Sequence, residues 1–393
     1  MTPLLPADEA ALAAILAATT APLAIVGNAT KAAMLRPVQA AQTLSTAALT
    51  GIPLYAPKEL VLRAGAGTPV PEIEAILAAS GQHLIAEPPD FSALFGTALP
   101  ATIGGIVAAN LSGPRRIAWG ATRDHLLGIR AVNGRGEVIR SGGRVLKNVT
   151  GLDLCKLLAG SHGTLAVLTE VTLKVLPAPE AVGTVALAVA DPAAGVAALA
   201  ASLGAPYGVS AAAFLPAEAA ARVGLTGPVA LARIEDFAPS VAYRCGRLAG
   251  ELAGFGRAEV LDDATSRTLW RAIRDAAPLG ADPAAGEAVW RLSVRPSAGA
   301  AALAASGLRG FLDWGGGLVW LAGPPTEATH QRVAAAARGQ GGSWTLFRAP
   351  ESLAAAVAVI PPEPAPLARI GAAVKAAFDP RGILNPGRMG AGR

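Results

Sequence analysis

The residues best suited to chemistry lie in a glycine-containing segment in the first third of the chain. Thr102-Ile103-Gly104-Gly105 places adjacent glycines after a small polar residue, and the small apolar stretch Ile106–Asn110 follows as the start of a predicted helix. Adjacent glycines let main-chain N–H groups converge on phosphate oxygens, because no Cβ blocks the approach and positive φ is allowed. A helix N-terminus adds its dipole. The segment predicts a phosphate cradle, with a tight turn in an alanine-rich scaffold as the alternative.

A second candidate loop follows a predicted buried strand. Leu23–Val26 is apolar throughout, and Gly27-Asn28-Ala29-Thr30-Lys31 continues it with small and polar residues that end in a lysine. Such a loop can wrap a diphosphate, because its backbone is accessible and the lysine supplies positive charge. An ordinary strand–loop connection is the alternative.

Arg115 and Arg116 are candidate anion ligands, since a guanidinium pairs with a diphosphate or with a substrate carboxylate. A solvated surface pair is the alternative. Candidate bases are few, because the chain has only four histidines. These histidines do not occur at metal-ligand spacings, and the two cysteines, Cys155 and Cys245, are isolated, so we expect neither a metal site nor an iron–sulfur motif. His125 and His162 are expected to pack beside the bound group.

The elements that must position these loops alternate between helices and strands, which predicts an α+β fold. Asn133-Gly134-Arg135-Gly136 is a turn signal between two predicted hairpin strands. Leu165–Val175 alternates, with Leu165, Val167, Val171, Leu173 and Val175 on one face and Glu170, Thr172 and Lys174 on the other, which predicts a half-buried strand. A short helix before it is capped by Thr150 or Asp153. Further predicted elements are a helix over Asp8–Thr19, a strand near Glu59–Ala64, a helix over Pro69–Ser80 and the hairpin strands Leu126–Val132 and Glu137–Ser141.

The pattern changes after Pro177 and Pro179, where alanine- and glycine-rich helices alternate with short strands. We place a boundary near Ala178 and predict a smaller α+β domain after it. Five tryptophans of this part are expected in the core, because large aromatic side chains are mostly buried: Trp270, Trp290, Trp314, Trp320 and Trp344. The tail from Ile370 begins as an amphipathic helix and ends in a turn held by Pro380, Gly382 and Pro386.

Composition excludes several classes of function. Lys and Arg total 33 against 28 Asp and Glu, a formal net charge of +5, but the charges are interspersed and form no basic block, which disfavours nucleic-acid binding. Asp8 and Glu9 precede the first apolar run, which argues against a signal peptide. The uncharged window Pro192–Ala217 is broken by glycine and proline and is not expected to span a membrane. We expect a cytoplasmic protein that reaches a membrane only through a partner.

Four motifs together resemble the FAD-linked oxidases of the vanillyl-alcohol-oxidase or PCMH type, and within that superfamily the FAD-binding subunits of bacterial glycolate oxidases. The resemblance is specific over Pro22–Pro177, recurs in Phe378–Met389, and is vague between them. The motifs are Thr102-Ile103-Gly104-Gly105, Gly113-Pro114-Arg115-Arg116, the segment from Lys147-Asn148 to Asp153-Leu154, and Gly163-Thr164-Leu165 with Leu168-Thr169-Glu170-Val171. The first loop departs from the family, which has more glycine where Ala29 stands.

The resemblance implies a PCMH-type FAD-binding domain over 1–178, a smaller α+β cap or substrate-side domain over 179–369, and a C-terminal element over 370–393 that packs back on the FAD domain. It implies non-covalent FAD, since no histidine lies near the first loop, and no metal. The cofactor-binding positions that it implies are Gly27, Asn28, Ala29, Thr30, Lys31, Pro100, Thr102, Ile103, Gly104, Gly105, Asn110, Gly113, Arg115, Arg116, Gly120, Ala121, Thr122, Asp124, Lys147, Asn148, Asp153, Gly163, Thr164, Val167 and Asn385.

The resemblance also implies an activity: oxidation of glycolate or a related short 2-hydroxy acid to the 2-keto acid, with electrons leaving through a sister FAD subunit and an iron–sulfur subunit. No catalytic base is identified, so the main substrate site is expected in a partner. Two alternatives stay open. One is a self-sufficient FAD-dependent D-2-hydroxy-acid dehydrogenase, and the other is a non-catalytic assembly or regulatory subunit that keeps the fold.

Overall fold

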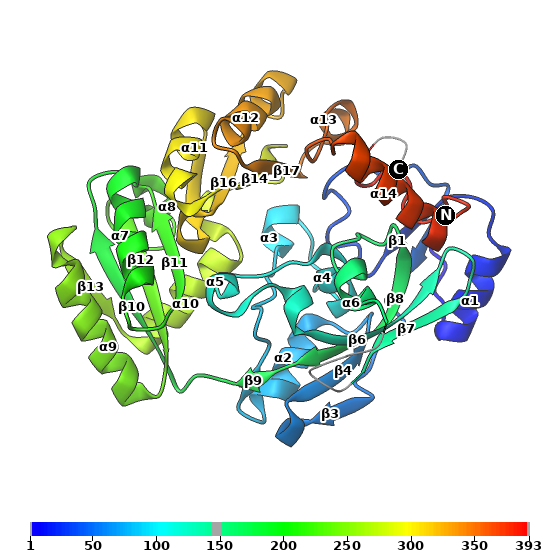
Figure 1. Cartoon of the computed structure of the whole chain (residues 1–393), viewed down its shortest axis with the longest axis horizontal. Coiled ribbons are helices and arrows are strands. Elements are labelled where there is room, and N and C mark those ends of the chain that lie inside the picture. The colour runs from blue at the N-terminus through cyan, green and yellow to red at the C-terminus, as the bar shows by residue number, and fades with distance from the viewer. Residues whose placement is uncertain (1, 144–150, 391–393) are drawn as a thin grey trace. The chain divides into compact units, whose positions relative to one another are not determined.

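The computed structural model describes residues 2–143 and 151–390 (Figure 1). Contacts divide the chain into two compact units. The first takes the described residues within Met1–Ser112, Ala121–Ala178 and Pro362–Arg393, and the second takes Gly113–Gly120 and Pro179–Pro361. The assignment of 1–178, 179–369 and 370–393 to a cofactor domain, a cap and a returning element is a statement about function, and it stays a prediction.

The first unit is built on a five-stranded antiparallel sheet with the order β3-β4-β8-β6-β7. Its strands are β3 (Leu54–Ala56), β4 (Val61–Gly65), β6 (Leu126–Asn133), β7 (Val138–Gly142) and β8 (Ala166–Lys174). Two small sheets accompany it: β1 (Leu23–Val26) with β2 (Gln42–Ser45) in parallel, and β5 (Gln82–His83) with β9 (Leu176–Pro177).

The predicted hairpin is confirmed, because β6 and β7 pair across the Asn133–Gly136 turn. The Asn133 side chain closes this turn, since its Oδ1 accepts from the N–H groups of Arg135 and Glu137 at 2.9 and 3.0 Å. The predicted strand near Leu165–Val175 is also confirmed as β8, but not as half-buried. It lies between β4 and β6, and Leu168 and Thr172, which alternate with the predicted apolar face, are buried as well.

Short helices connect and cover these strands: α1 (Glu9–Ala18), α2 (Val70–Ala78), α3 (Ser92–Phe95), α4 (Ile103–Ala109), α6 (Leu154–Leu158) and α14 (Ala365–Phe378). Helix α1 starts where Asp8 accepts a hydrogen bond from Ala11 N at 2.8 Å, and it buries Leu12 and Leu16. Asp153 caps α6; the alternative cap, Thr150, lies outside the described residues.

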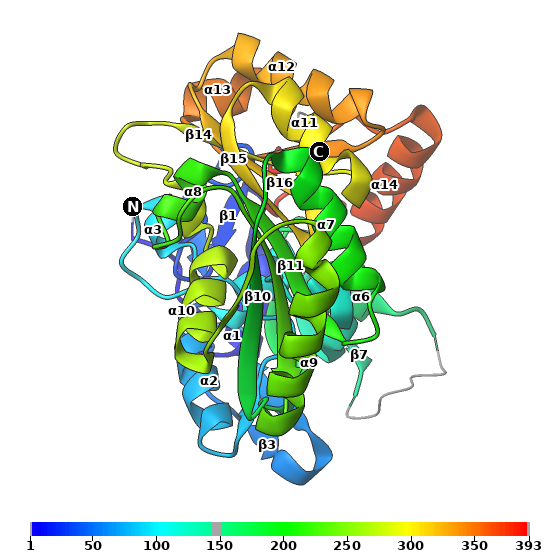
Figure 2. The ribbon, with the colours of Figure 1, turned by 90° about the vertical axis from the view of Figure 1, so that its left-hand side faces the viewer.

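The second unit contains an eight-stranded antiparallel sheet with the order β13-β10-β12-β11-β15-β16-β14-β17. It is built from the same βαββαβ pattern twice, and the two copies meet where Phe214 of β11 pairs with Leu312 of β15. Figure 2 shows helices α7 and α9 of the first copy lying along β10 and β11. The first copy comprises β10 (Ala181–Ala188), α7 (Pro192–Gly204), β11 (Val209–Leu215), β12 (Val229–Asp236), α9 (Ala238–Glu251) and β13 (Ala258–Leu261).

The second copy comprises β14 (Ala288–Ser293), α11 (Gly299–Ser306), β15 (Arg309–Asp313), β16 (Leu318–Gly323), α12 (Glu327–Gly339) and β17 (Ser343–Arg348). Helices α5 (Arg116–Trp119), α8 (Ala217–Ala221), α10 (Asp263–Arg274) and α13 (Glu351–Ala356) complete the unit. Four of the five tryptophans are buried as predicted, while Trp314 is only half-buried.

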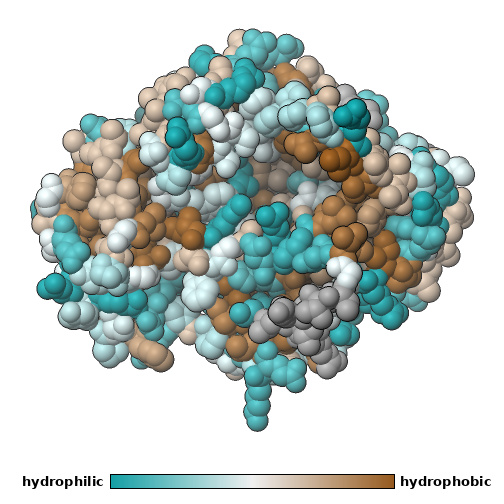
Figure 3. Space-filling view, in the orientation of Figure 1, coloured by the Kyte–Doolittle hydropathy of each residue, from teal (hydrophilic) through white to brown (hydrophobic). Residues whose placement is uncertain are grey.

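Figure 3 shows polar and apolar residues interspersed over the viewed face of the protein. Within residues 2–143 and 151–390, we find no helix with both the length and the apolar character needed to cross a bilayer.

The turn that follows α14 in the C-terminal segment is held together by a buried carboxylate. Asp379 accepts hydrogen bonds from Lys375 Nζ at 2.6 Å, Ile383 N at 3.1 Å and Leu384 N at 2.8 Å. Beyond it, Leu23 N donates to Ile383 O at 2.8 Å, so the segment extends the small sheet beside β1. A Cβ on Gly134 would lie 2.3 Å from Asp379 Oδ1, so this hairpin turn requires glycine at its contact with the segment.

We expect Asp379→Ala to destabilise the first unit by about 3 kcal/mol, because it leaves Lys375 and two main-chain donors without their shared acceptor. Urea unfolding of the full chain measures this. The matched control is Glu218→Ala, which removes a carboxylate 76% exposed in its ion pair with Arg222, and should change stability by less than about 0.5 kcal/mol. Equal effects of the two substitutions would contradict the anchoring role.

Candidate cofactor-binding site

The site is assembled from segments of the first unit that approach one another so closely that only glycine fits. A Cβ on Gly27 would lie 2.4 Å from Thr102 Oγ1, and one on Gly104 would lie 2.7 Å from the Cβ of Ala66. Gly105 does not share this restriction, but it lies beside the same loop, since a Cβ there would be at an ordinary contact distance of 3.5 Å from Lys31 Nζ. The structure thus brings together the two loops that the sequence singled out.

The expectation that Gly104 and Gly105 form an anion nest ahead of a helix is wrong. Both lie within the first turn of α4, which begins at Ile103. Their N–H groups are already used: Ile103 N donates to Thr68 O at 2.9 Å, Gly104 N to Ala66 O at 2.8 Å, and Gly105 N to Thr102 Oγ1 at 3.2 Å. The glycines serve close packing, and whether they touch a cofactor stays a prediction.

The unused N–H groups lie in the other loop. Within the described residues, no hydrogen-bond acceptor is found for the main-chain N–H groups of residues 28–31. The loop is held by Asn28, whose Nδ2 donates to Pro100 O at 2.9 Å, and it turns at Ala29, which has φ +54°. Successive N–H groups around a residue of positive φ form the concave arrangement that binds anions.

Positive charge is buried around this loop. Burial lowers the pKa of Lys31 to about 8, with the Asp90 carboxylate opposing the shift. Burial also lowers the pKa of His162 to about 3, assisted by the charges of Arg388 and Lys31, so this imidazole is neutral at physiological pH. Burial lowers the pKa of Arg388 to about 10, which leaves it cationic. The two remaining cations favour an anion at this place.

Arg388 is a further residue of the candidate site, and it was not among the positions predicted from the sequence. Its guanidinium donates to the carbonyl oxygens of Lys31 at 2.7 Å, Ala32 at 2.9 Å and Arg36 at 3.1 Å, and so it shapes the loop from behind. The sequence feature that could have indicated Arg388 is its position directly after Asn385-Pro386-Gly387, in the turn that ends the C-terminal tail. Nothing in the spacing shows that this residue returns to a loop more than 350 positions earlier.

Asn385 ties three segments together through its amide. Its Oδ1 accepts from Ile25 N at 2.7 Å, and its Nδ2 donates to His162 O at 2.8 Å. Gly163 follows at φ +69°, and a Cβ there would lie 2.9 Å from Asn385 Nδ2. Asn385 therefore positions the site's backbone through its side chain.

Several residues of the site have left-handed backbone conformations that non-glycine residues adopt at a cost. They are Ala29 at φ +54°, Asn110 at +48°, His162 at +51° and Asn385 at +43°. Asparagine and histidine are among the residues enriched in this region, whereas alanine is less suited to it. Such residues gather where function constrains the backbone, so their concentration here agrees with a binding site.

Other predicted positions of the first unit build its surrounding loops. Thr122 N donates to Ser112 Oγ at 2.9 Å, and Asp124 Oδ2 accepts from Ala121 N at 2.8 Å. Asn110 Oδ1 accepts from Arg123 N at 3.0 Å. Thr30 accepts a hydrogen bond from Lys31 Nζ at 3.0 Å, and Thr164 Oγ1 donates one to Ser161 O at 2.7 Å. Asp153 caps helix α6, and Val167 lies in the hydrophobic core. Lys147 and Asn148 lie outside the described residues.

Gly113, Arg115, Arg116 and Gly120 belong to the second unit. There Arg115 is not a surface group: its Nε donates to Glu235 Oε2 at 3.0 Å in a buried ion pair. Burial by itself would raise the pKa of Glu235, but the charges of Arg233 and Arg115 outweigh it and hold the pKa well below the usual range. Arg116 stacks on Trp314, with 4.3 Å between its Cζ and the ring centroid.

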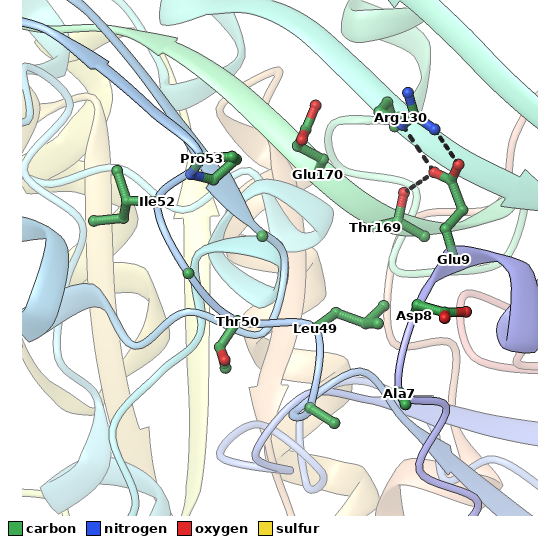
Figure 4. Close-up of a pocket in the computed structure, with 13 residues that line it drawn as sticks. Ala7, Asp8, Glu9, Leu49, Thr50, Ile52, Pro53, Arg130, Thr169 and Glu170 are labelled. Atoms are coloured by element: carbon green, nitrogen blue, oxygen red, sulfur yellow. Dashed lines mark hydrogen bonds and ion pairs between the residues drawn. The ribbon is translucent and has the colours of Figure 1, made fainter.

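A pocket of about 520 Å³ lies elsewhere in the first unit, between the start of α1, the loop at residues 48–53 and strands β4, β6 and β8 (Figure 4). Its charges are matched. Arg130 Nε donates to Glu9 Oε2 at 3.0 Å, and Thr169 Oγ1 donates to the same oxygen at 2.7 Å. None of the predicted cofactor positions lines this pocket.

Comparison with known proteins places this geometry in context. A family model described as an FAD binding domain matches residues 4–142. Glycolate oxidase subunit GlcE of Escherichia coli is 35% identical over 372 residues, which is 94% of this chain and 92% of that protein. Glycolate oxidase subunit GlcD of Bacillus subtilis is 44% identical over 79 residues, 20% of this chain and 17% of that protein.

The crystal structure of p-cresol methylhydroxylase with substrate bound shares the fold, with a TM-score of 0.69 and 13% identity over 98% of this chain and 88% of that one. The predicted α+β, PCMH-type fold is therefore confirmed. The cofactor is FAD. The N–H groups of residues 28–31, for which no acceptor is found among the described residues, and the neighbouring Lys31 fit its diphosphate chemically.

We expect Ala29→Gly to stabilise the chain by up to about 1 kcal/mol, because glycine removes the left-handed strain, although it also gains freedom in the unfolded state. Thermal unfolding of the FAD-free protein measures this. Ala75→Gly, at an exposed position inside helix α2, is the control and should lower stability by about 1 kcal/mol. Destabilisation by both substitutions would show that Ala29 is unstrained.

Proposed function

The chain belongs to the family of the glycolate oxidase subunit GlcE, and from that premise we propose that it is the FAD-binding subunit of a complex that oxidises glycolate or a related short 2-hydroxy acid to the 2-keto acid. FAD, held without a covalent bond, supplies a two-electron acceptor for such an oxidation. Electrons leave through a sister FAD subunit and an iron–sulfur subunit. Any association with a membrane comes through those partners.

The observation that carries the proposal is the cationic loop of the first unit. Lys31 and the N–H groups of residues 28–31 would hold the diphosphate, while Arg388 keeps the loop in shape from the opposite side. Asn385 and His162 fix the backbone that surrounds it. A neutral His162 adds no third charge, so the loop accommodates one anion without excess repulsion among its cations.

The proposal assigns the base that takes the substrate's hydroxyl proton to a partner subunit. In the described ranges, no group of three or more His, Cys, Asp and Glu side chains is placed to hold a metal. Two histidines interact within the protein: neutral His162 lies near Lys31 and Arg388, and His330 Nδ1 accepts from Trp290 Nε1 at 3.2 Å. Their engagement is compatible with a base supplied by a partner subunit.

We expect Lys31→Met to weaken FAD binding about tenfold or more, because it removes a charge-assisted contact to phosphate. In the FAD-free protein, the pKa of Lys31 is about 8. A bound diphosphate raises it, so FAD affinity should fall as pH rises through 8 and above, while the affinity of the Lys31→Met variant stays level. Fluorescence titration with FAD between pH 7 and pH 9 measures both.

Lys58→Met is the control for this titration, because Lys58 is an exposed lysine of the short helical turn Pro57–Glu59. It should leave both the affinity and its pH dependence unchanged. An identical pH profile for the wild type and the Lys31→Met variant would contradict the role of Lys31.

The proposed function is tested by anaerobic addition of glycolate to the purified chain, first alone and then with its sister and iron–sulfur subunits. We expect acid to release flavin from the chain, and glycolate to bleach the flavin only in the assembled complex. Bleaching of the chain alone would favour a self-sufficient D-2-hydroxy-acid dehydrogenase. Normal glycolate oxidation by a complex built with a flavin-free variant would favour an assembly subunit.

A further inference from the structure

The second copy of the βαββαβ pattern carries a buried guanidinium on the sheet face opposite its helix α12. Trp290 of β14 faces that helix, because its Nε1 donates to His330 of α12 at 3.2 Å. Successive side chains of a strand point to opposite faces. Arg291 therefore points to the other face, together with Trp320, its direct partner on β16.

Aromatic rings surround this guanidinium. The Cζ of Arg291 lies 4.9 Å from the ring centroid of Trp320, 5.3 Å from that of Trp314 and 5.3 Å from that of Phe347. Its Nε is buried and has no hydrogen-bond partner among the described residues. Aromatic faces attract a cation but accept little of the hydrogen bonding that a guanidinium offers. A buried donor without an acceptor is costly, so the arrangement is incomplete as it stands.

Further positive charge lies close by. Arg116 stacks on the same Trp314 ring at 4.3 Å. Burial lowers the pKa of Arg291 to about 10, and the charge of Arg116 adds to this shift while Asp313 opposes it. Arg291 stays cationic at neutral pH.

The backbone of Trp314 is strained for a large residue, with φ +53°. Its position is fixed at both ends, because its N donates to Asp313 Oδ1 at 2.7 Å and its Nε1 donates to Gly113 O at 3.2 Å. The aromatic platform on which both guanidiniums stack is thus held rigidly in place.

Another buried arginine of this unit, Arg233, shows how the hydrogen-bonding capacity of a guanidinium is satisfied within the protein. Arg233 stacks on Trp270 at 4.9 Å, as Arg291 stacks on Trp320. Unlike Arg291, it donates to Ser210 Oγ at 3.1 Å and forms an ion pair with Glu235 at 3.3 Å. The Arg291 site has the same cation and ring, and it lacks the carboxylate.

We propose that Arg291, with Arg116 and the Trp314 platform, binds the carboxylate of a small 2-hydroxy acid or its 2-keto product. A planar carboxylate matches the fork of a guanidinium and would satisfy the donor that the protein leaves unpaired. The surrounding rings exclude water and strengthen the attraction. The identity of the acid rests on the proposed function, whereas the carboxylate site rests on the geometry of the second unit alone.

The test uses oxalate, a carboxylate that cannot be oxidised to a 2-keto acid, titrated into the FAD-loaded full chain. Isothermal titration calorimetry gives the affinity, and tryptophan fluorescence reports on Trp314 and Trp320 beside the site. We expect saturable binding by the wild type, at least about tenfold weaker binding by Arg291→Met, and intermediate weakening by Arg116→Met. Arg291→Lys keeps the charge but not the fork, so it should restore only part of the affinity.

The matched control is Arg338→Met, which removes an exposed arginine stacked on Trp344 at 5.1 Å in the same copy of the pattern. It should leave oxalate binding unchanged. If Arg291→Met fails to fold, Arg116→Met decides the question. Failure of the wild type to bind oxalate, or unchanged affinity in the arginine variants, overturns the proposal.

The two proposals fail in different ways. If Arg291→Met abolishes oxalate binding while the wild-type complex does not oxidise glycolate, the carboxylate site stands and the assigned substrate is wrong. If the complex oxidises glycolate with the same KM in wild type and the Arg291→Met variant, the function stands and the site proposal is overturned.

Discussion

Buried positive charge that a single nearby carboxylate only partly offsets is the constraint on which the first unit depends. Lys31 and Arg388 are held close to neutral His162, and the opposing charge near Lys31 comes from Asp90. Such an arrangement costs folding energy, because each desolvated cation loses hydration that the protein only partly replaces. In the binding mode proposed above, the FAD diphosphate would offset that cost, so the charges that weaken the FAD-free protein would strengthen its complex with FAD.

The second unit applies the same principle in two versions. Its repeated βαββαβ pattern places a guanidinium against a tryptophan in each copy, at Arg233 and at Arg291. In the first copy Glu235 balances the charge and the ion pair is structural. In the second copy the corresponding acceptor is missing. The same repeated fold thus holds one arginine whose hydrogen bonds are satisfied within the protein and one whose Nε has no acceptor among the described residues.

Local signals were sufficient to predict much of this architecture. Asp8 before an apolar helix, the Asn133–Gly136 turn and the apolar run Leu23–Val26 each determine their element through nearby residues. The apolar face of β8 was predicted correctly, but the burial of Leu168 and Thr172 on its other face was not, because it depends on elements distant in the sequence that cover that face. Likewise, Gly104 and Gly105 became helical because Thr68 and Ala66 accept the N–H groups of Ile103 and Gly104. The role of Arg388 depends on a chain return that no local pattern encodes.

The anchoring of residues 379–388 beside β1 has a consequence for biosynthesis. A ribosome completes the entire second unit before it adds Asp379, Asn385 and Arg388. Until those residues emerge, the 27–31 loop lacks the guanidinium that shapes it, and β1 lacks its neighbouring segment. Nascent chains truncated within the second unit therefore lack the contacts that complete this loop. If FAD binds at the loop as proposed, such chains would bind it only after residues 379–388 have been synthesised.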